Sequence, residues 1–126
     1  KADFLIYFKT KAEKKDEKVS FDEYQKHAYN LISADGKKDM VLNGVLGLAG
    51  EAGECCDIVK KVKFQGHTMD KEHLIEEIGD VLWYVAETAS GLGVSLSDVA
   101  QYNLDKLHKR YHGEEFHKED SINRQK

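Results

Sequence analysis

The chain has 126 residues, 40% of them hydrophobic and 33% charged, with a net charge of −4 at pH 7. This length predicts one domain with a modest core, and the acidic balance argues against a nucleic-acid-binding surface. No apolar run approaches the roughly 20 residues that cross a bilayer, and two adjacent cysteines offer no disulfide framework, so we expect a cytoplasmic protein without a membrane partner.

The chain begins with a charged stretch. Residues 1–18 are predicted to form an N-terminal extension, and residues 19–126 to form the folded domain. The whole chain lacks proline, which permits long uninterrupted helices. The first helix is expected from Phe21 to about Ser33, because Ser20 and Glu23 form a capping box at its start.

Three more helices are expected further along the chain. One spans about residues 38–63. Another begins after Asp70, a good N-cap, and runs to about Ser90, where glycines end it. The last begins at Ser95 or Ser97 and reaches about Tyr111. The predicted fold class is therefore all-α, a bundle of four to five helices.

The second predicted helix contains an ExxE motif in the stretch GLAGEAGE, residues 47–54. With about 100° between successive helical residues, Glu51 projects into the middle of the apolar face. Glu54 projects to the polar edge of that face. The opposite side is expected to face solvent and carries Asp57, Lys60 and Lys61. An acidic side chain is thus predicted on the inner face of the helix.

The third predicted helix contains a matching pair, Glu77 and Asp80. Glu77 borders the apolar arc of this helix, whereas Asp80 projects further out. We expect Glu72, Glu76 and Glu87 to form an ordinary solvated face. For this pair alone, a solvated surface is therefore an alternative interpretation to a functional site.

Carboxylates that converge between two helices repel one another, so they must either take up protons or bind a divalent cation. Oxygen ligands suit Mg²⁺, with Mn²⁺ as a possible substitute, better than zinc, which prefers histidine and cysteine. The Glu-x-x-His motifs of a di-iron bundle are missing from both pairs. The sequence therefore favours a magnesium site.

The fourth predicted helix has a polar stripe beside its apolar arc. Asn103, Lys106 and Arg110 follow i, i+3, i+7 spacing and share one face. Such a stripe is usually a solvated surface, but at the border of a core it is a candidate phosphate clamp. His108 and His112, four residues apart, are a further candidate metal pair at an exposed helix end.

The stretches GLAGEAGE, EEIGDVLWY and NLDKLHKRY occur in this order, and together they resemble the MazG-like nucleoside triphosphate pyrophosphohydrolases. That family's signature is ExxE, a spacer and then ExxD. Here the spacer is residues 55–76. The similarity covers about four-fifths of the chain, from Phe21 to the last predicted helix. The ExxE motif alone is common, but the ordered set of motifs is specific.

The resemblance implies roles for individual residues. The catalytic carboxylates that hold Mg²⁺ would be Glu51, Glu54, Glu77 and Asp80. The residues contacting the triphosphate would be Asn103 and Lys106, with Lys60, Lys61 and Arg110 as further candidates. The nucleotide pocket would be lined by Tyr84 and Asn43, with Trp83 supporting its wall.

The reaction implied by the resemblance is hydrolysis of a (d)NTP to the monophosphate and pyrophosphate, in nucleotide-pool house-cleaning. Family members form homodimers or homotetramers whose pockets are completed by helices from more than one copy. One departure is Gly50, which replaces an extra glutamate of some members and leaves the water-activating base open. The alternatives are a non-catalytic domain that binds nucleotide and Mg²⁺, and a purely structural helical oligomer.

Overall fold

The computed structural model describes residues 18–124, so nearly all of the predicted N-terminal extension lies outside the described residues. The described residues form helices joined by turns and contain no strand, which confirms the all-α prediction. Its elements are α2 (Phe21–Leu31), a 3₁₀ turn (Gly36–Lys38), α3 (Met40–Phe64), α4 (Lys71–Gly91), α5 (Leu96–Arg110) and α6 (Lys118–Ile122).

The helices begin where side chains satisfy the free N–H groups of a first turn. Ser20 Oγ accepts from Glu23 N at 3.2 Å. Asp70 Oδ1 and Ser95 Oγ each accept at 3.0 Å from the amide three residues later. The predicted start of each of these helices is thus confirmed. The first helix ends earlier than predicted, because Ile32 already has an extended backbone with ψ of 130°.

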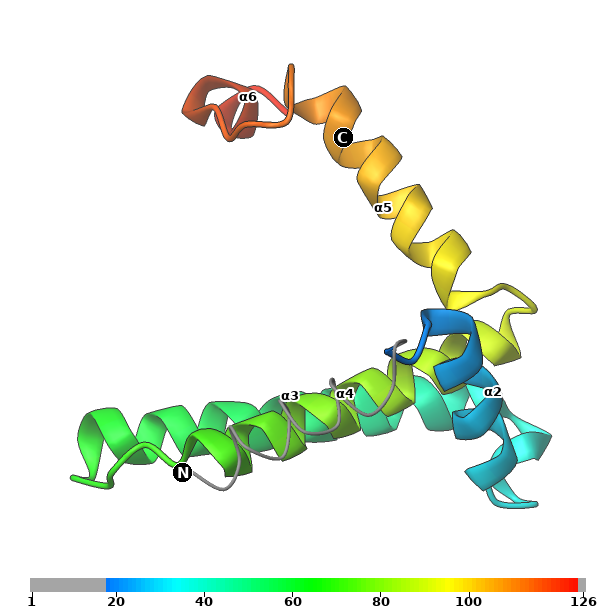
Figure 1. Cartoon of the computed structure of the whole chain (residues 1–126). Helices are drawn as coiled ribbons and strands as arrows, with labels where there is room; N and C mark the ends of the chain where they lie inside the picture. The colour runs from blue at the N-terminus through cyan, green and yellow to red at the C-terminus, as the bar shows by residue number, and fades with distance from the viewer. Residues whose placement is uncertain (1–17, 125–126) are drawn as a thin grey trace.

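Two long helices dominate the molecule (Figure 1). α3 and α4 lie side by side and antiparallel, and α2 packs across one end of this hairpin. From the same end α5 leaves the hairpin, and α6 lies beyond the far end of α5. Within one chain, α5 therefore packs on the other helices only near its first turns. None of the described helices is long and apolar enough to cross a bilayer.

Glycines on α3 allow the two long helices to approach closely. A Cβ at Gly44 would lie 2.2 Å from Thr88 Oγ1, and one at Gly47 would lie 2.2 Å from Tyr84 Cε1. Any larger residue would therefore push the helices apart. These contacts fix the register between α3 and α4, and with it the position of Glu51 opposite α4.

The core lies where α2, α4 and α5 meet. The buried cluster consists of Ala28, Ala86, Ala89 and Leu96, and Tyr24, Trp83 and Val85 pack around it. In the distal half of the hairpin, away from α2, the inner residues of α3 are only half buried. The acidic pairs lie on this thinner, two-helix part of the molecule.

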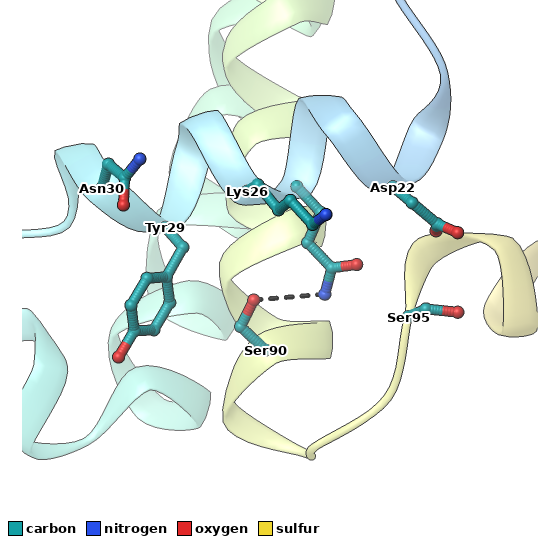
Figure 2. Close-up of a pocket in the computed structure, with 7 residues that line it drawn as sticks. Asp22, Lys26, Tyr29, Asn30, Ser90 and Ser95 are labelled. Atoms are coloured by element: carbon teal, nitrogen blue, oxygen red, sulfur yellow. Dashed lines mark hydrogen bonds between the residues drawn. The ribbon is translucent and has the colours of Figure 1, made fainter.

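A hydrogen-bonded junction sets the direction of α5 (Figure 2). Gln25 Nε2 donates to Ser90 Oγ at 3.1 Å and to the Val94 carbonyl at 2.9 Å, and its Oε1 accepts from Leu96 N at 2.8 Å. Asp22 Oδ1 accepts from Ser97 Oγ at 2.7 Å. A shallow pocket of about 470 Å³ lies at this junction. The first turn of α5 is thus tied to both α2 and α4.

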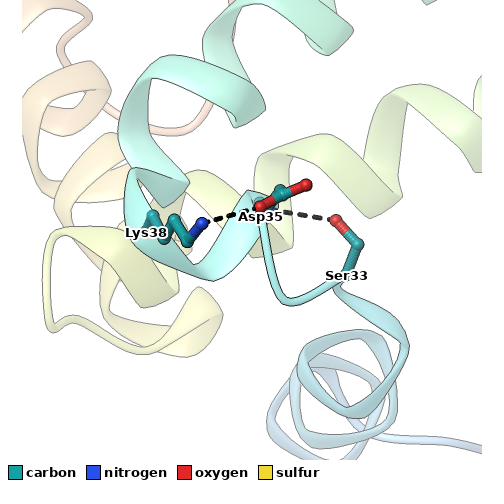
Figure 3. A network of polar contacts seen from close by, with 4 residues as sticks. Ser33, Asp35 and Lys38 are labelled. Carbon is teal, nitrogen blue, oxygen red and sulfur yellow. Dashed lines mark hydrogen bonds and ion pairs between the residues drawn. The ribbon is translucent and has the colours of Figure 1, made fainter.

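The connector between α2 and α3 is a compact polar turn (Figure 3). Ser33 Oγ accepts from Gly36 N at 3.0 Å, and Lys38 Nζ lies 2.9 Å from Asp35 Oδ1. Asp39 then caps α3, its Oδ1 accepting from Leu42 N at 3.1 Å. The turn redirects the chain from α2, which crosses the end of the hairpin, into α3, which runs along α4.

Candidate functional site

Three carboxyl groups meet between the two long helices. Glu51 comes from α3, and Glu77 and Asp80 come from α4. One oxygen of each lies within 4.8 Å of the others. Glu51 and Glu77 are half buried, and Asp80 is exposed. The hairpin thus gathers residues from both halves of the ExxE and ExxD pattern, although they are separated by two helical segments and a loop.

The electrostatics of this acidic cluster favour an extra proton. A hydrogen bond between the Glu51 and Glu77 carboxyl groups is the main cause that raises the pKa of Glu51 above its ordinary value. Partial desolvation and the negative charges of Asp80, Glu77 and Glu54 raise this pKa further. The three acids therefore make ionisation of Glu51 less favourable than that of an isolated glutamate.

Glu54, the second acid of the ExxE motif, stands apart from this group. Its side chain is exposed, and it does not belong to the group of three oxygens. Its negative charge nevertheless contributes to the raised pKa of both Glu51 and Lys61. Glu54 therefore borders the acidic cluster from the solvent side.

Two residues beside the cluster were missed in the sequence. His73 Nε2 lies 3.3 Å from Glu77 Oε1, one turn away on α4. Tyr24 of α2 is close enough for the charge of Asp80 to add to the effect of burial, and both raise the pKa of the phenol. The i, i+4 spacing of His73 and Glu77 was a readable signal. The approach of Tyr24 depends on how α2 packs, which no local pattern shows.

The two candidate lysines on α3 both contact Asp57. Lys60 Nζ lies 3.1 Å from Asp57 Oδ1, and Lys61 Nζ contacts Oδ2 at 2.6 Å. The hydrogen bonds from Lys61 and Lys60 lower the pKa of Asp57, and the bond to Asp57 raises the pKa of Lys61. Such accessible ion pairs contribute little to stability. Both ammonium groups therefore remain free to exchange this partner for another anion.

The candidate nucleotide-pocket residues follow the acidic cluster along the hairpin toward α2. Tyr84 lies one turn after Asp80, and its ring meets Trp83 edge to face with centroids 5.1 Å apart. About one turn further along α4, Glu87 Oε1 accepts a hydrogen bond from Asn43 Nδ2 of α3 at 2.7 Å. Aromatic and amide groups thus line the same hairpin as the carboxyls.

The expectation that Glu87 faces solvent is wrong. Its side chain is fully buried, and Oε2 has no hydrogen-bond partner among the described residues. The prediction failed because helical projection treated α4 alone. At this end of the hairpin, α2 and α3 both pack on α4 and cover the face that carries Glu87.

The predicted phosphate clamp lies on the other limb of the molecule. Asn103 and Lys106 are exposed on α5, and Arg110 is half buried near its end. Because α5 contacts α2 and α4 through its first turns and then leaves the hairpin, one chain does not bring these side chains to the acidic cluster (Figure 1).

Residues 42–113 match the family model described as "MazG nucleotide pyrophosphohydrolase domain". The chain is also similar to "Gene 37 protein" of Mycobacterium phage L5, at 45% identity over 69 residues, which cover 52% of this chain and 60% of that protein. It is 37% identical over 73 residues to "Uncharacterized protein YvdC" of Bacillus subtilis (strain 168), covering 51% of this chain and 69% of that protein. No solved structure matches the chain.

Proposed function

Since the chain belongs to the MazG nucleotide pyrophosphohydrolase domain family, we propose that it hydrolyses nucleoside triphosphates, with Mg²⁺, to the monophosphate and pyrophosphate. The observation that carries this proposal is the meeting of Glu51, Glu77 and Asp80 between α3 and α4. A purely structural helix pair has no need for three acids at one point of its contact.

The donor set fits a hard divalent cation. All three groups offer carboxylate oxygens, which Mg²⁺ and Mn²⁺ prefer. The raised pKa of Glu51 reflects the crowding of negative charge at this point, which a bound cation would relieve. Glu51, Glu77 and Asp80 would hold the ion, which supplies charge that polarises phosphoryl oxygens and acidifies bound water.

The remaining site residues act on the substrate and the attacking water. Glu54, exposed beside the cluster, orients that water and accepts its proton. Tyr84, Trp83 and Asn43 contact the nucleoside further along the hairpin. These positions agree with a substrate lying along the α3–α4 surface, with its phosphates at the acids.

The groups that contact the leaving pyrophosphate come from α5, where Lys106 and Arg110 supply positive charge and the Asn103 amide supplies hydrogen bonds. Within one chain α5 points away from the acidic cluster (Figure 1). We therefore propose a homodimer or homotetramer in which α5 of one copy reaches the acids of another. Lys60 and Lys61 would assist from the rim of the site.

The exposed surface of α3 supports this assembly. Large apolar side chains that a monomer leaves in water are Leu42 (56% exposed), Val45 (48%), Leu46 (65%) and Val59 (48%). A second copy covering these side chains would contribute about 25 cal/mol for each Å² of apolar surface removed from water. Light scattering coupled to chromatography should therefore find an oligomer at micromolar concentration.

Release of pyrophosphate from a panel of (d)NTPs tests the reaction. The wild type should turn over at least one nucleotide only when Mg²⁺ is present. Asp80→Asn should lose both turnover and the Mg²⁺-induced rise in melting temperature. Glu54→Gln should lose turnover but keep that rise, because Glu54 is not proposed to hold the ion. Binding without any product would identify a nucleotide sensor instead, and neither binding nor product would identify a structural oligomer.

Complementation tests whether two copies share one site. Asp80→Asn and Lys106→Ala chains should each be inactive alone. Co-expressed from two genes, they should recover about a quarter of wild-type activity, since half of randomly formed dimers are mixed and each has one intact site. Lys109→Ala, three residues along the same helix, is the matched control and should remain active. No recovery in verified mixed dimers would place both groups in the same chain.

A further inference from the structure

A second cluster of metal-binding groups lies in the segment beyond α5, on the limb that leaves the hairpin (Figure 1). Beyond α5, His112, His117 and Asp120 each present a nitrogen or oxygen within 4.8 Å of the others. His112 Nδ1 lies 2.7 Å from Asp120 Oδ2, which also accepts from the His112 backbone N–H at 3.3 Å. The His112 and His117 rings stack in parallel, with centroids 4.1 Å apart.

An ordinary ion pair accounts for only part of this arrangement. A contact between His112 and Asp120 at an accessible position stabilises the chain little. It also gives no reason for His117 to bring a second imidazole to the same carboxylate. Two imidazoles and one carboxylate are, in contrast, a ligand set that binds divalent ions of the zinc type.

We propose that His112, His117 and Asp120 bind a divalent transition ion of the zinc type, and that this ion holds the C-terminal segment 111–123 in one conformation. The site differs from the acidic cluster in chemistry as well as in place. Imidazole nitrogen favours zinc over Mg²⁺, whereas the all-oxygen cluster favours Mg²⁺. The two sites are therefore separately testable.

The geometry requires a small rearrangement when the ion binds. One ion cannot lie in the planes of two parallel rings, so one imidazole must turn out of the stack. The His112 side chain is 76% exposed and free to turn, while Asp120, at 20%, is held more firmly. With bonds of about 2.0–2.2 Å to zinc, ligand atoms lie roughly 3.5 Å apart. The ligand atoms, now within 4.8 Å of one another, therefore each need to move by only about 1 Å.

The segment that the ion would fasten has few other attachments. Tyr111 and Phe116 pack with ring centroids 5.5 Å apart, and His108 Nε2 lies 3.7 Å from Glu114 Oε1. Phe116 and Ile122 are 72% and 69% exposed, so apolar burial holds the segment weakly. α5 ends at Arg110, so His112 lies beyond the helix and the i, i+4 spacing considered for His108 and His112 from the sequence does not hold. An ion that binds only the folded segment stabilises it by mass action.

Isothermal titration of Zn²⁺ into the full chain, free of any oligohistidine tag, tests the proposal. Excess Mg²⁺ is present throughout to compete at the acidic cluster. One zinc per chain should bind, and His117→Ala and Asp120→Asn should each weaken it roughly tenfold or more, the least expected for loss of a ligand. His27→Ala, an exposed histidine on α2, is the matched control and should bind zinc as the wild type does.

Hydrogen exchange supplies a readout of the segment itself. Zinc should slow exchange of the Ser121 and Asn123 amides, which donate to the His117 and Glu119 carbonyls, in the wild type but not in Asp120→Asn. Circular dichroism checks that the variants keep their helices. Zinc binding of equal strength in His117→Ala, or no binding beyond the acidic cluster, would overturn the proposal. So would wild-type exchange that zinc leaves unchanged.

Discussion

The close contact between α3 and α4 makes a quantitative prediction at Gly44. A methyl group there would lie 2.2 Å from Thr88 Oγ1, 3.0 Å from Thr88 N and 3.2 Å from Thr88 Cα. Rotation of the Thr88 side chain relieves only the first contact, so the helices must separate. Overpacking of this kind costs about 3 kcal/mol at the upper end of its range. The better helix propensity of alanine returns about 1 kcal/mol. Gly44→Ala should therefore lower the free energy of unfolding by about 2 kcal/mol.

Gly50→Ala is the matched control on the same helix, because a Cβ there meets no atom within 4 Å. The free energy of unfolding of Gly50→Ala should rise by up to about 1 kcal/mol from helix propensity alone. Urea unfolding at several protein concentrations measures both values and separates folding from assembly. Adding Thr88→Ala should rescue Gly44→Ala in part, since the contact with the Thr88 backbone remains. Equal stability of Gly44→Ala and Gly50→Ala would refute the close packing described for α3 and α4.

Two further predictions concern the buried Glu87 carboxyl and the titration of Glu51. Asn43→Ala removes the donor to the fully buried Glu87 carboxyl, so it should lower the free energy of unfolding in urea by about 1–3 kcal/mol. Glu87→Gln should leave the free energy of unfolding nearly unchanged. A larger loss of stability in Glu87→Gln than in Asn43→Ala would contradict the contact between these two side chains. Because the pKa of Glu51 is raised, the folded state binds more protons than the unfolded state just above the ordinary glutamate pKa. Stability without metal should therefore fall as pH rises through that window. Melting curves in chelator should show this slope in the wild type and a weaker one in Glu51→Gln, and an equal slope would exclude Glu51 as its source.

Much of the fold was readable from local signals. The N-caps Ser20, Asp70 and Ser95 mark helix starts that the structure confirms. These signals act within one turn, so the sequence alone contains them. The same helical spacing indicated that Glu51 lies on the inner face of α3, where the structure also has it, half buried.

Features that depend on packing between helices were not readable. Glu87 was expected in solvent because neither α2 nor α3 enters a single-helix projection. Asn103, Lys106 and Arg110 share a face of α5, but the direction of α5 is set by the bonds of Gln25 at the junction with α4. The cluster of His112, His117 and Asp120 was not predicted either, because these side chains meet only after the chain turns back beyond α5.

The central claim is that the carboxyls of α3 and α4 hold a divalent cation at the reacting phosphates. Anomalous diffraction from crystals grown with Mn²⁺ and a nonhydrolysable nucleotide tests it directly. We predict a manganese peak ligated by Glu51, Glu77 and Asp80 and by a phosphate oxygen. A nucleotide bound elsewhere, with the three side chains turned to solvent and no peak between the helices, would contradict it.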